Sequence, residues 1–236
     1  MKKLTTLLAR FLISTPVNLF LWYGKILGGV LPSPLGEAVI FQKLTNKWSP
    51  TVSNKGFRFD ARDKASEARG VRILEKEPDT IAWIQAEIDR GDVFYDVGAN
   101  VGVFSVYAAK KRGAIVYAFE PEAKNYEVLN RNILLNNLGG QVVALCLALH
   151  NEDTVSTLHL SSLEAGRSQH SFLRKTNVYH ETTTPIFPQG ALGVRGDSLV
   201  DTFGLPLPNH LKIDVDGNED LVVQGMKKLL TSTQVR

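Results

Sequence analysis

Cysteine is nearly absent from this chain, which has a single one, Cys146, among its 236 residues. One thiol can form neither an intramolecular disulfide nor a metal site built on several cysteines. Because Cys146 lies in the apolar run Val142–Leu149, we expect a small buried side chain rather than a reactive thiol. Metal-ligand spacing is also missing among the histidines, so we assign no site to any of them: His150, His159, His170, His180 and His210. The composition favours a globular protein of a reducing compartment.

A long uninterrupted apolar run is missing as well. A helix that spans a membrane needs roughly 20 predominantly apolar residues, whereas Arg10, Pro16, Asn18 and Lys25 interrupt the most apolar stretch near the N-terminus. No convincing small-x-small cleavage site follows that stretch, which argues against a secretory signal peptide. The sequence therefore predicts neither a spanning helix nor a cleaved leader.

A net positive charge is confined to the N-terminal part of the chain. Residues 1–64 hold ten Lys or Arg against three Asp or Glu, while residues 65–236 hold seventeen against twenty-one. The larger part is therefore mildly acidic, which is unfavourable for a general nucleic-acid-binding protein. We expect no nucleic-acid partner.

The basic N-terminal end is a candidate for contact with an anionic membrane surface. Residues 1–31 combine the excess of positive charge with Trp22 and Tyr23, which suit headgroup depth in an interfacial helix. The alternative is a helical arm packed on its own domain or on a second copy of the chain in a homo-oligomer. We predict a basic, apolar helical arm and linker over residues 1–50, in a cytoplasmic protein that can associate with the inner membrane surface.

Short apolar runs alternate with helical patterns in the rest of the chain. Helical periodicity occupies Gly102–Arg112 and Lys124–Asn137, and an earlier helix begins at Pro78. Four apolar runs have the length of strands: Val93–Val97, Ile115–Phe119, Val142–Leu149 and Leu211–Val215. Near-continuous apolar strands separated by helices are typical of a parallel sheet covered on both faces. Residues 51–236 are therefore predicted to form an α/β domain with a doubly wound, mostly parallel, Rossmann-like sheet.

Two parts of this domain are less regular. The segment 151–210 is too long for a bare loop, so we expect one or two strands plus an insertion near the substrate. The predicted helix Glu219–Leu230 is followed by only six residues, although a crossover should lead to a further parallel strand. Stopping there would expose an apolar edge strand, and we expect a chain truncated at its C-terminus.

Two acidic residues stand at the ends of the first two predicted strands. Asp96 closes the first strand and is followed by a turn at Gly98 and a helix near Gly102; Glu120 closes the second. Ligands of such sheets bind at the carboxyl ends of the strands. There Asp96 can accept a hydrogen bond from an ammonium group, and Glu120 can accept from both hydroxyls of a ribose. S-adenosylmethionine carries both groups.

A nicotinamide dinucleotide is the competing cofactor on this fold. Its binding loop reads Gly-x-Gly-x-x-Gly, whereas this loop reads Gly98-Ala-Asn-Val-Gly102 and lacks the middle glycine. That glycine allows close approach of a pyrophosphate, which Asp96 would also repel. The sequence therefore disfavours a dinucleotide.

At these residues the chain resembles the FkbM-type methyltransferases. Three blocks carry the resemblance: Asp96-Val-Gly-Ala-Asn-Val-Gly102, Phe119-Glu-Pro121 and Leu211-Lys-Ile-Asp-Val-Asp-Gly-Asn-Glu219. Weaker matches are Glu77-Pro78 and Gly196-Asp-Ser-Leu199. The resemblance covers roughly residues 71–230 and implies methyl transfer from S-adenosylmethionine to a hydroxyl group. It also implies a set of cofactor-binding residues: Asp96, Gly98, Ala99, Asn100, Gly102 and Glu120.

The block after the fourth predicted strand supplies candidates for catalysis. Asp214, Asp216 and Glu219 follow one another at the end of that strand, and a carboxylate base would assist a hydroxyl, which is a poor nucleophile at neutral pH. Alternatively, three carboxylates could hold a divalent ion. In a structural interpretation, Glu219 begins the next helix and Lys212 pairs with Asp214.

The sequence thus favours an S-adenosylmethionine-dependent O-methyltransferase whose acceptor is a hydroxyl of a sugar, a glycan or a secondary metabolite. Two alternatives stay open. One is an RNA methyltransferase on the same fold, which would need a basic surface beside the site. The other is a non-catalytic, membrane-attached module that retains the fold, because the expected truncation puts activity in doubt.

Overall fold

The computed structural model describes residues 51–62, 68, 72, 75, 77–166, 170–173 and 185–235. The predicted N-terminal arm and linker over residues 1–50 therefore lie outside the described residues. Of the helices in the described ranges, none has the length and apolar character needed to cross a membrane.

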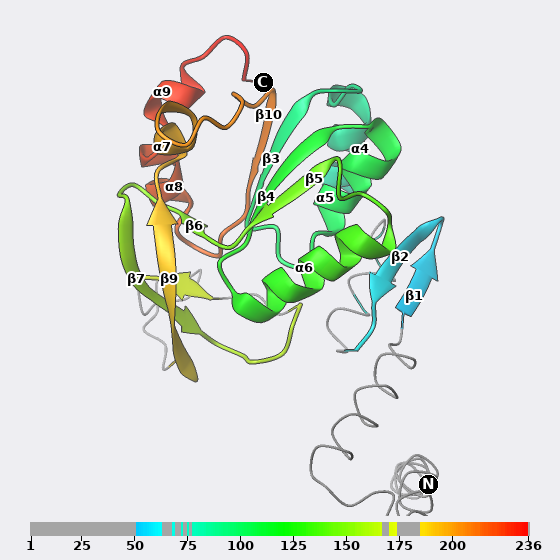
Figure 1. Cartoon of the computed structure of the whole chain (residues 1–236), viewed down its shortest axis with the longest axis horizontal. Coiled ribbons are helices and arrows are strands. Elements are labelled where there is room, and N and C mark those ends of the chain that lie inside the picture. Colours follow the sequence, from blue (N-terminus) through cyan, green and yellow to red (C-terminus); the bar gives the residue numbers. More distant parts are fainter. Residues whose placement is uncertain are drawn as a thin grey trace, which may run out of the picture. The chain divides into compact units, whose positions relative to one another are not determined.

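The main sheet has four parallel strands (Figure 1). Its order is β10 (His210–Ile213), β3 (Val93–Val97), β4 (Ile115–Phe119) and β5 (Val142–Leu145). Each neighbouring pair is parallel, so the carboxyl ends of β3, β4 and β10 meet at one edge. The predicted α/β fold with a mostly parallel, Rossmann-like sheet is confirmed.

Alternating side chains of these strands pack against two separate layers of helices. Phe94 and Val116 face α4 (Pro78–Glu87), α5 (Val103–Tyr107) and α6 (Ala123–Leu135) in one core. Tyr95 and Phe119 belong to a second core on the opposite face. That core is closed by α7 (Gly196–Asp201), α8 (Glu219–Gln224) and α9 (Lys227–Leu230), which lie across the sheet from α4 and α5 in Figure 1. Because successive residues of a strand point to opposite faces, continuous apolar runs serve both cores, and the sheet is doubly wound.

Helix boundaries differ from the prediction at two points. The predicted helix Gly102–Arg112 is α5 followed by a π-helical turn, η1 (Ala108–Arg112). The predicted helix Glu219–Leu230 is two helices, α8 and α9, because the helix is interrupted at Gly225 and Met226. A Cβ on Gly225 would lie 2.0 Å from the carbonyl oxygen of His150, so the break sits where two backbones touch.

A second sheet of four strands stands beside the carboxyl edge of the main sheet. Its order is β6 (Ala148–Leu149), β9 (Phe187–Val194), β7 (Thr154–Leu160) and β8 (Ser171–Phe172). The run Val142–Leu149, predicted as one strand, is therefore divided between the two sheets, since β6 leaves β5 to pair with β9. The irregular segment 151–210 supplies three of these strands, one or two more than expected.

A short antiparallel hairpin precedes α4. It joins β1 (Thr51–Asn54) to β2 (Phe57–Asp60) through Lys55 and Gly56, both with positive φ. Phe57 is fully buried in the same core as α4 and α6, so the hairpin belongs to the domain that carries the site.

Candidate functional site

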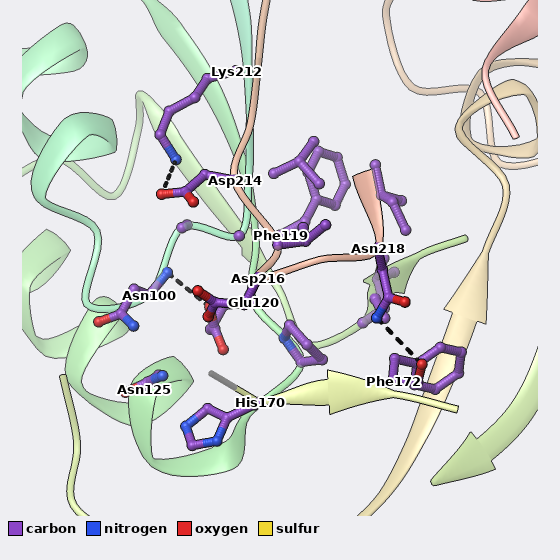
Figure 2. A pocket seen from close by; sticks show the side chains of 18 of the residues that line it. Asn100, Phe119, Glu120, Asn125, His170, Phe172, Lys212, Asp214, Asp216 and Asn218 are labelled. Carbon is purple, nitrogen blue, oxygen red and sulfur yellow. Dashed lines mark hydrogen bonds and ion pairs between the residues drawn. The ribbon is translucent and has the colours of Figure 1, made fainter. Parts of the chain in front are cut away.

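A cavity opens at the carboxyl edge of the main sheet, where ligands of parallel α/β sheets bind (Figure 2). Its walls come from the ends of β3, β4 and β10 and from β6, β7 and β8 of the second sheet. One part of the lining is polar and includes Glu120, Asn125 and Lys212. Another part is apolar and includes Leu149, Leu158 and Phe172.

The turn at Gly98, which follows β3, contacts the ends of both β4 and β10. Gly98 has a φ of 74°, and a Cβ at this position would lie 1.9 Å from the carbonyl oxygen of Asp214. The backbone amides of Gly98 and Ala99 both donate to the carbonyl oxygen of Phe119, at 3.0 Å. Glycine is therefore required here both by its conformation and by the close approach of β10. Gly98, Ala99 and Asn100 all line the cavity, as a cofactor-binding loop should.

Gly102 allows two helices to pack closely and does not line the cavity. It begins α5 with a φ of 79°, and a Cβ at this position would lie 2.2 Å from Cδ1 of Leu129 in α6. It does not belong to the lining of the cavity. The structure thus assigns Gly102 to the packing of two helices and gives no direct support for its predicted contact with the cofactor.

Glu120 lies on the cavity wall at the end of β4, with 5% of its surface exposed. Its carboxylate accepts hydrogen bonds from the backbone amides of Asn100 at 2.7 Å and Glu122 at 3.0 Å. Burial raises the pKa of Glu120 to about 7, although these amides act in the opposite direction. The predicted ribose acceptor is therefore a carboxyl group that changes its charge near neutral pH.

Asp96 lies behind the wall, fully buried, and is not among the lining residues. Its Oδ2 accepts a hydrogen bond of 2.6 Å from the hydroxyl of Ser105, and its Oδ1 lies 3.3 Å from Nζ of Lys212. Lys212 itself lines the cavity. Burial opposes the charge of Lys212, but the carboxylates of Asp96 and Asp214 outweigh it and raise the pKa of this lysine. Asp96 therefore does not border the cavity itself but pairs with Lys212, a charged residue that does. A direct contact between Asp96 and the ammonium group of the cofactor stays a prediction.

The three predicted catalytic carboxylates separate into two groups. Asp214 and Asp216 both line the cavity, and Oδ2 of Asp214 lies 3.6 Å from Nζ of Lys212. Glu219 is absent from the lining; its carboxylate accepts from the backbone amides of Val215 at 3.1 Å and Gly217 at 3.1 Å. It also begins α8, as its structural interpretation requires. Within the described ranges, no three His, Cys, Asp or Glu residues gather where they could hold a metal ion.

Sequence reasoning missed several residues of the cavity. Glu77 and Lys212 stand in motifs that carry the resemblance, yet neither was assigned to the site. Three further lining residues are His170, Phe172 and Asn218. The first two come from the irregular segment between β7 and β9, where no periodic pattern marks them. Asn218 donates through Nδ2 to the carbonyl oxygen of Phe172 at 3.3 Å, which ties the loop after β10 to β8 (Figure 2).

The expectation for the single cysteine is wrong. Cys146 is exposed, because the chain leaves β5 one residue earlier and turns towards β6. Its Sγ lies 3.9 Å from the carbonyl oxygen of Pro121. Partial burial and the nearby carboxylates of Glu120 and Glu122 raise the pKa of the thiol, so it is less reactive than an ordinary cysteine.

These groups fit S-adenosylmethionine. Gly98, Ala99 and Asn100 line the cavity as part of the loop between β3 and α5, where a ligand can contact them. Glu120 offers a buried carboxylate for ribose hydroxyls. Asp214 and Asp216 add negative charge to a cavity that would receive a ligand with a net positive charge. The apolar lining from β6 to β8 suits a purine or an acceptor with apolar surface.

Comparisons with known proteins agree with this fit. The family described as Methyltransferase FkbM domain matches residues 96–236. Hexuronic acid methyltransferase AglP of Haloferax volcanii is 29% identical over 184 residues, which cover 77% of this chain and 69% of that protein. Methyltransferase sdnD of Sordaria araneosa is 41% identical over 60% of this chain and 62% of its own length.

A third relative bears the family's name. The 31-O-demethyl-FK506 methyltransferase FkbM of Streptomyces tacrolimicus is 39% identical over 57 residues, which are 24% of this chain and 22% of that protein. The family match extends from the acid at the end of β3, through the glycine turn, to the C-terminal residue and so includes every predicted site residue. The chain therefore belongs to the FkbM family of S-adenosylmethionine-dependent methyltransferases.

Proposed function

We propose that this methyltransferase acts on a hydroxyl group of a sugar, a glycan or a secondary metabolite. One observation carries the proposal. Two carboxylates, those of Asp214 and Asp216, stand at the end of β10 on the wall of the cavity that also holds Glu120 and the Gly98 turn. A base placed there lies at the same strand edge as the groups that fit the cofactor.

S-adenosylmethionine supplies an electrophilic methyl group whose leaving group is a neutral thioether. The acceptor oxygen forms the new O–C bond as the C–S bond breaks, and the electron pair of that bond stays on sulfur. The hydroxyl proton passes to a carboxylate of this chain. Asp216 is the better candidate, because it lines the cavity on a backbone held in the left-handed region, at a φ of 57°, a strain that native proteins keep mainly at functional sites. The remaining part of the rate enhancement comes from holding oxygen, carbon and sulfur in line.

The charges of the cavity favour an uncharged acceptor. Its lining contains the acidic residues Glu77, Glu120, Asp214 and Asp216 against one basic residue, Lys212. Since Lys212 is already paired with Asp96 and Asp214, it does not offer a full charge to an anionic ligand. A carboxylate acceptor would meet like charges, whereas a hydroxyl would meet a base. The name of one relative mentions an O-demethylated compound and so supports a hydroxyl acceptor. The name of another mentions a hexuronic acid, which supports a sugar but carries a carboxylate besides its hydroxyls, so the product must be tested for an ester as well as an ether.

The nature of the product tests the proposal. The full chain should transfer a labelled methyl group from S-adenosylmethionine to a component of glycan or metabolite extracts, and the label should resist mild alkali, as an ether does. An alkali-labile label would identify a methyl ester and contradict the hydroxyl proposal. Cofactor binding without transfer to any extract would favour the non-catalytic module, and label in RNA would favour the alternative enzyme.

A further inference from the structure

His170 lines the cavity immediately before β8. Figure 2 places its ring on the same side of the cavity as Asn125, away from Phe172 and Asn218. The preceding turn is attached to that side, because the backbone amide of Gly166 donates to Oδ1 of Asn125 at 2.7 Å. His170 also lies close enough to Glu122 for the two side chains to interact electrostatically. The imidazole thus belongs to the part of the cavity that contains Glu120.

The hydrogen bonds of His170 determine its tautomer. The backbone amide of Ser161 donates to Nδ1 of the imidazole at 3.2 Å, so Nδ1 carries the lone pair and the ring proton of the neutral form lies on Nε2. Burial lowers the pKa of His170, although Glu122 acts against this shift, and the ring is therefore neutral at physiological pH. It offers one N–H donor without adding charge.

That donor has no acceptor in the described part of the chain. Nε2 of His170 is buried and makes no hydrogen bond there. A buried N–H without a partner is unfavourable, so native proteins seldom leave one unsatisfied unless a ligand completes it. An acceptor atom brought by the cofactor would remove this deficit.

We propose that His170 is a cofactor-binding residue whose Nε2–H donates a hydrogen bond to the adenosyl part of S-adenosylmethionine. This assignment rests on the proposed function, since it takes the cavity as the cofactor site. Glu120 accepts from the ribose hydroxyls in that scheme, and the groups next to them are the ribose oxygens and the ring nitrogens of the purine. These are acceptors, as a neutral N–H donor requires. A residue that directly precedes β8 of the second sheet thus takes part in binding the cofactor.

Titration calorimetry with S-adenosylhomocysteine tests the assignment in the full chain. The variant His170→Phe keeps a ring of similar shape and removes the donor, and we expect its affinity to fall about 3- to 10-fold, the usual range for one neutral hydrogen bond. The matched control is His159→Phe, which makes the same change on β7 outside the cavity lining and should leave the affinity unchanged.

Analogues of S-adenosylhomocysteine separate a hydrogen bond from a change of shape. The 1-deaza, 3-deaza, 7-deaza, 2′-deoxy, 3′-deoxy and carbocyclic compounds each lack one candidate acceptor. For one of them, the native chain should lose affinity while His170→Phe shows no further loss. Equal affinities of the native chain and His170→Phe, or an equal loss in both for every analogue, would overturn the assignment and leave the proposed function intact. A native chain that binds no cofactor would contradict both.

Discussion

Lys212 and Asp96 stand directly opposite each other on the parallel strands β10 and β3, and Nζ of the lysine lies 3.3 Å from Oδ1 of the aspartate. The aspartate side chain is fully buried, and 10% of the lysine side chain is exposed. A lysine from the last strand of the main sheet thus neutralises the acid that ends the first strand of the site. The positive charge of Lys212 offsets the free-energy cost of burying the carboxylate of Asp96 beneath the glycine turn.

Removing the lysine should therefore destabilise the fold. We expect Lys212→Met to lower the free energy of unfolding by about 3–5 kcal/mol, because the charge of Asp96 would stay buried without its partner. The double variant Lys212→Met/Asp96→Asn should recover part of this loss. Urea denaturation measures both values. Lys228→Met is the control, since Lys228 pairs with Asp201 on the exposed surface and its loss should change little. Equal effects of the two lysine substitutions would contradict a structural role for the buried pair.

Binding of the cofactor should depend on pH through Glu120. The pKa of this carboxyl is raised to about 7 by burial, and only its ionised form accepts from two ribose hydroxyls. The dissociation constant of S-adenosylmethionine should thus fall by about 10-fold between pH 6 and pH 8, as titration calorimetry would show. Glu120→Gln should abolish this dependence, and Glu120→Ala should weaken binding by ~1.5–3 kcal/mol. The exposed Glu152→Gln should behave as the native chain does.

Ionisation of Glu120 should strengthen cofactor binding but lower the stability of the free protein. A folded-state pKa above the ordinary value means that the native protein holds the proton more tightly than the unfolded chain. The contribution of Glu120 is therefore fully present below pH 4.5 and is lost as the pH rises through about 7. Ligand affinity and stability of the free protein should change in opposite directions across this window. A parallel rise of both would show that Glu120 is not the group that titrates.

The turn at Gly98 offers a test with a close control inside the chain. Gly98 and Gly91 both have a positive φ, of 74° and 89°, but only a Cβ at Gly98 would meet other atoms within 4 Å. Gly91→Ala should lower the free energy of unfolding by roughly 1–2 kcal/mol, the backbone penalty alone. Gly98→Ala should cost more, since the strand end of Asp214 must move, and should also weaken cofactor binding. If Gly98→Ala and Gly91→Ala lose equal stability and cofactor binding is unchanged, the close approach of β10 to Gly98 does not contribute to the site.

The extent to which the sequence predicted this site follows from the range of its interactions. Asp96 and Glu120 could be placed together because parallel strands end at one edge, and the glycine turn between them is local. For Glu219 the sequence offered both a catalytic role and a structural one at the start of the next helix, and the hydrogen bonds from the backbone amides of its own loop, which the residue pattern does not show, favour the structural role. His170 reaches the cavity through the pairing of β7 with β8, a contact between distant residues of an irregular segment. Such contacts depend on tertiary packing rather than on periodicity.

The N-terminal residues give a prediction that concerns partners. The concentration of Lys and Arg in residues 1–64 and the aromatic residues near Trp22 motivate contact with an anionic membrane surface. The native chain should float with vesicles that contain phosphatidylserine, and a variant without residues 1–31 should not. Added salt should weaken the flotation, because the attraction is electrostatic. Equal flotation of both proteins, or of neither, would favour an arm packed on protein.

The carboxylates after β10 allow catalysis to be separated from structure. Asp216→Asn should lower turnover by roughly 10²–10⁴-fold, far more than it weakens cofactor binding, as expected when a general base is removed. Asp214→Asn should have a smaller effect on turnover and a larger one on stability, because its carboxylate shares Lys212 with Asp96. Glu219→Gln is the matched control: it weakens the hydrogen bonds to Val215 and Gly217, so stability should fall while turnover per folded molecule persists. Single-turnover kinetics and urea denaturation measure the two quantities. Full turnover in Asp216→Asn with a strong loss in Glu219→Gln would reverse the assignment and place the base on α8.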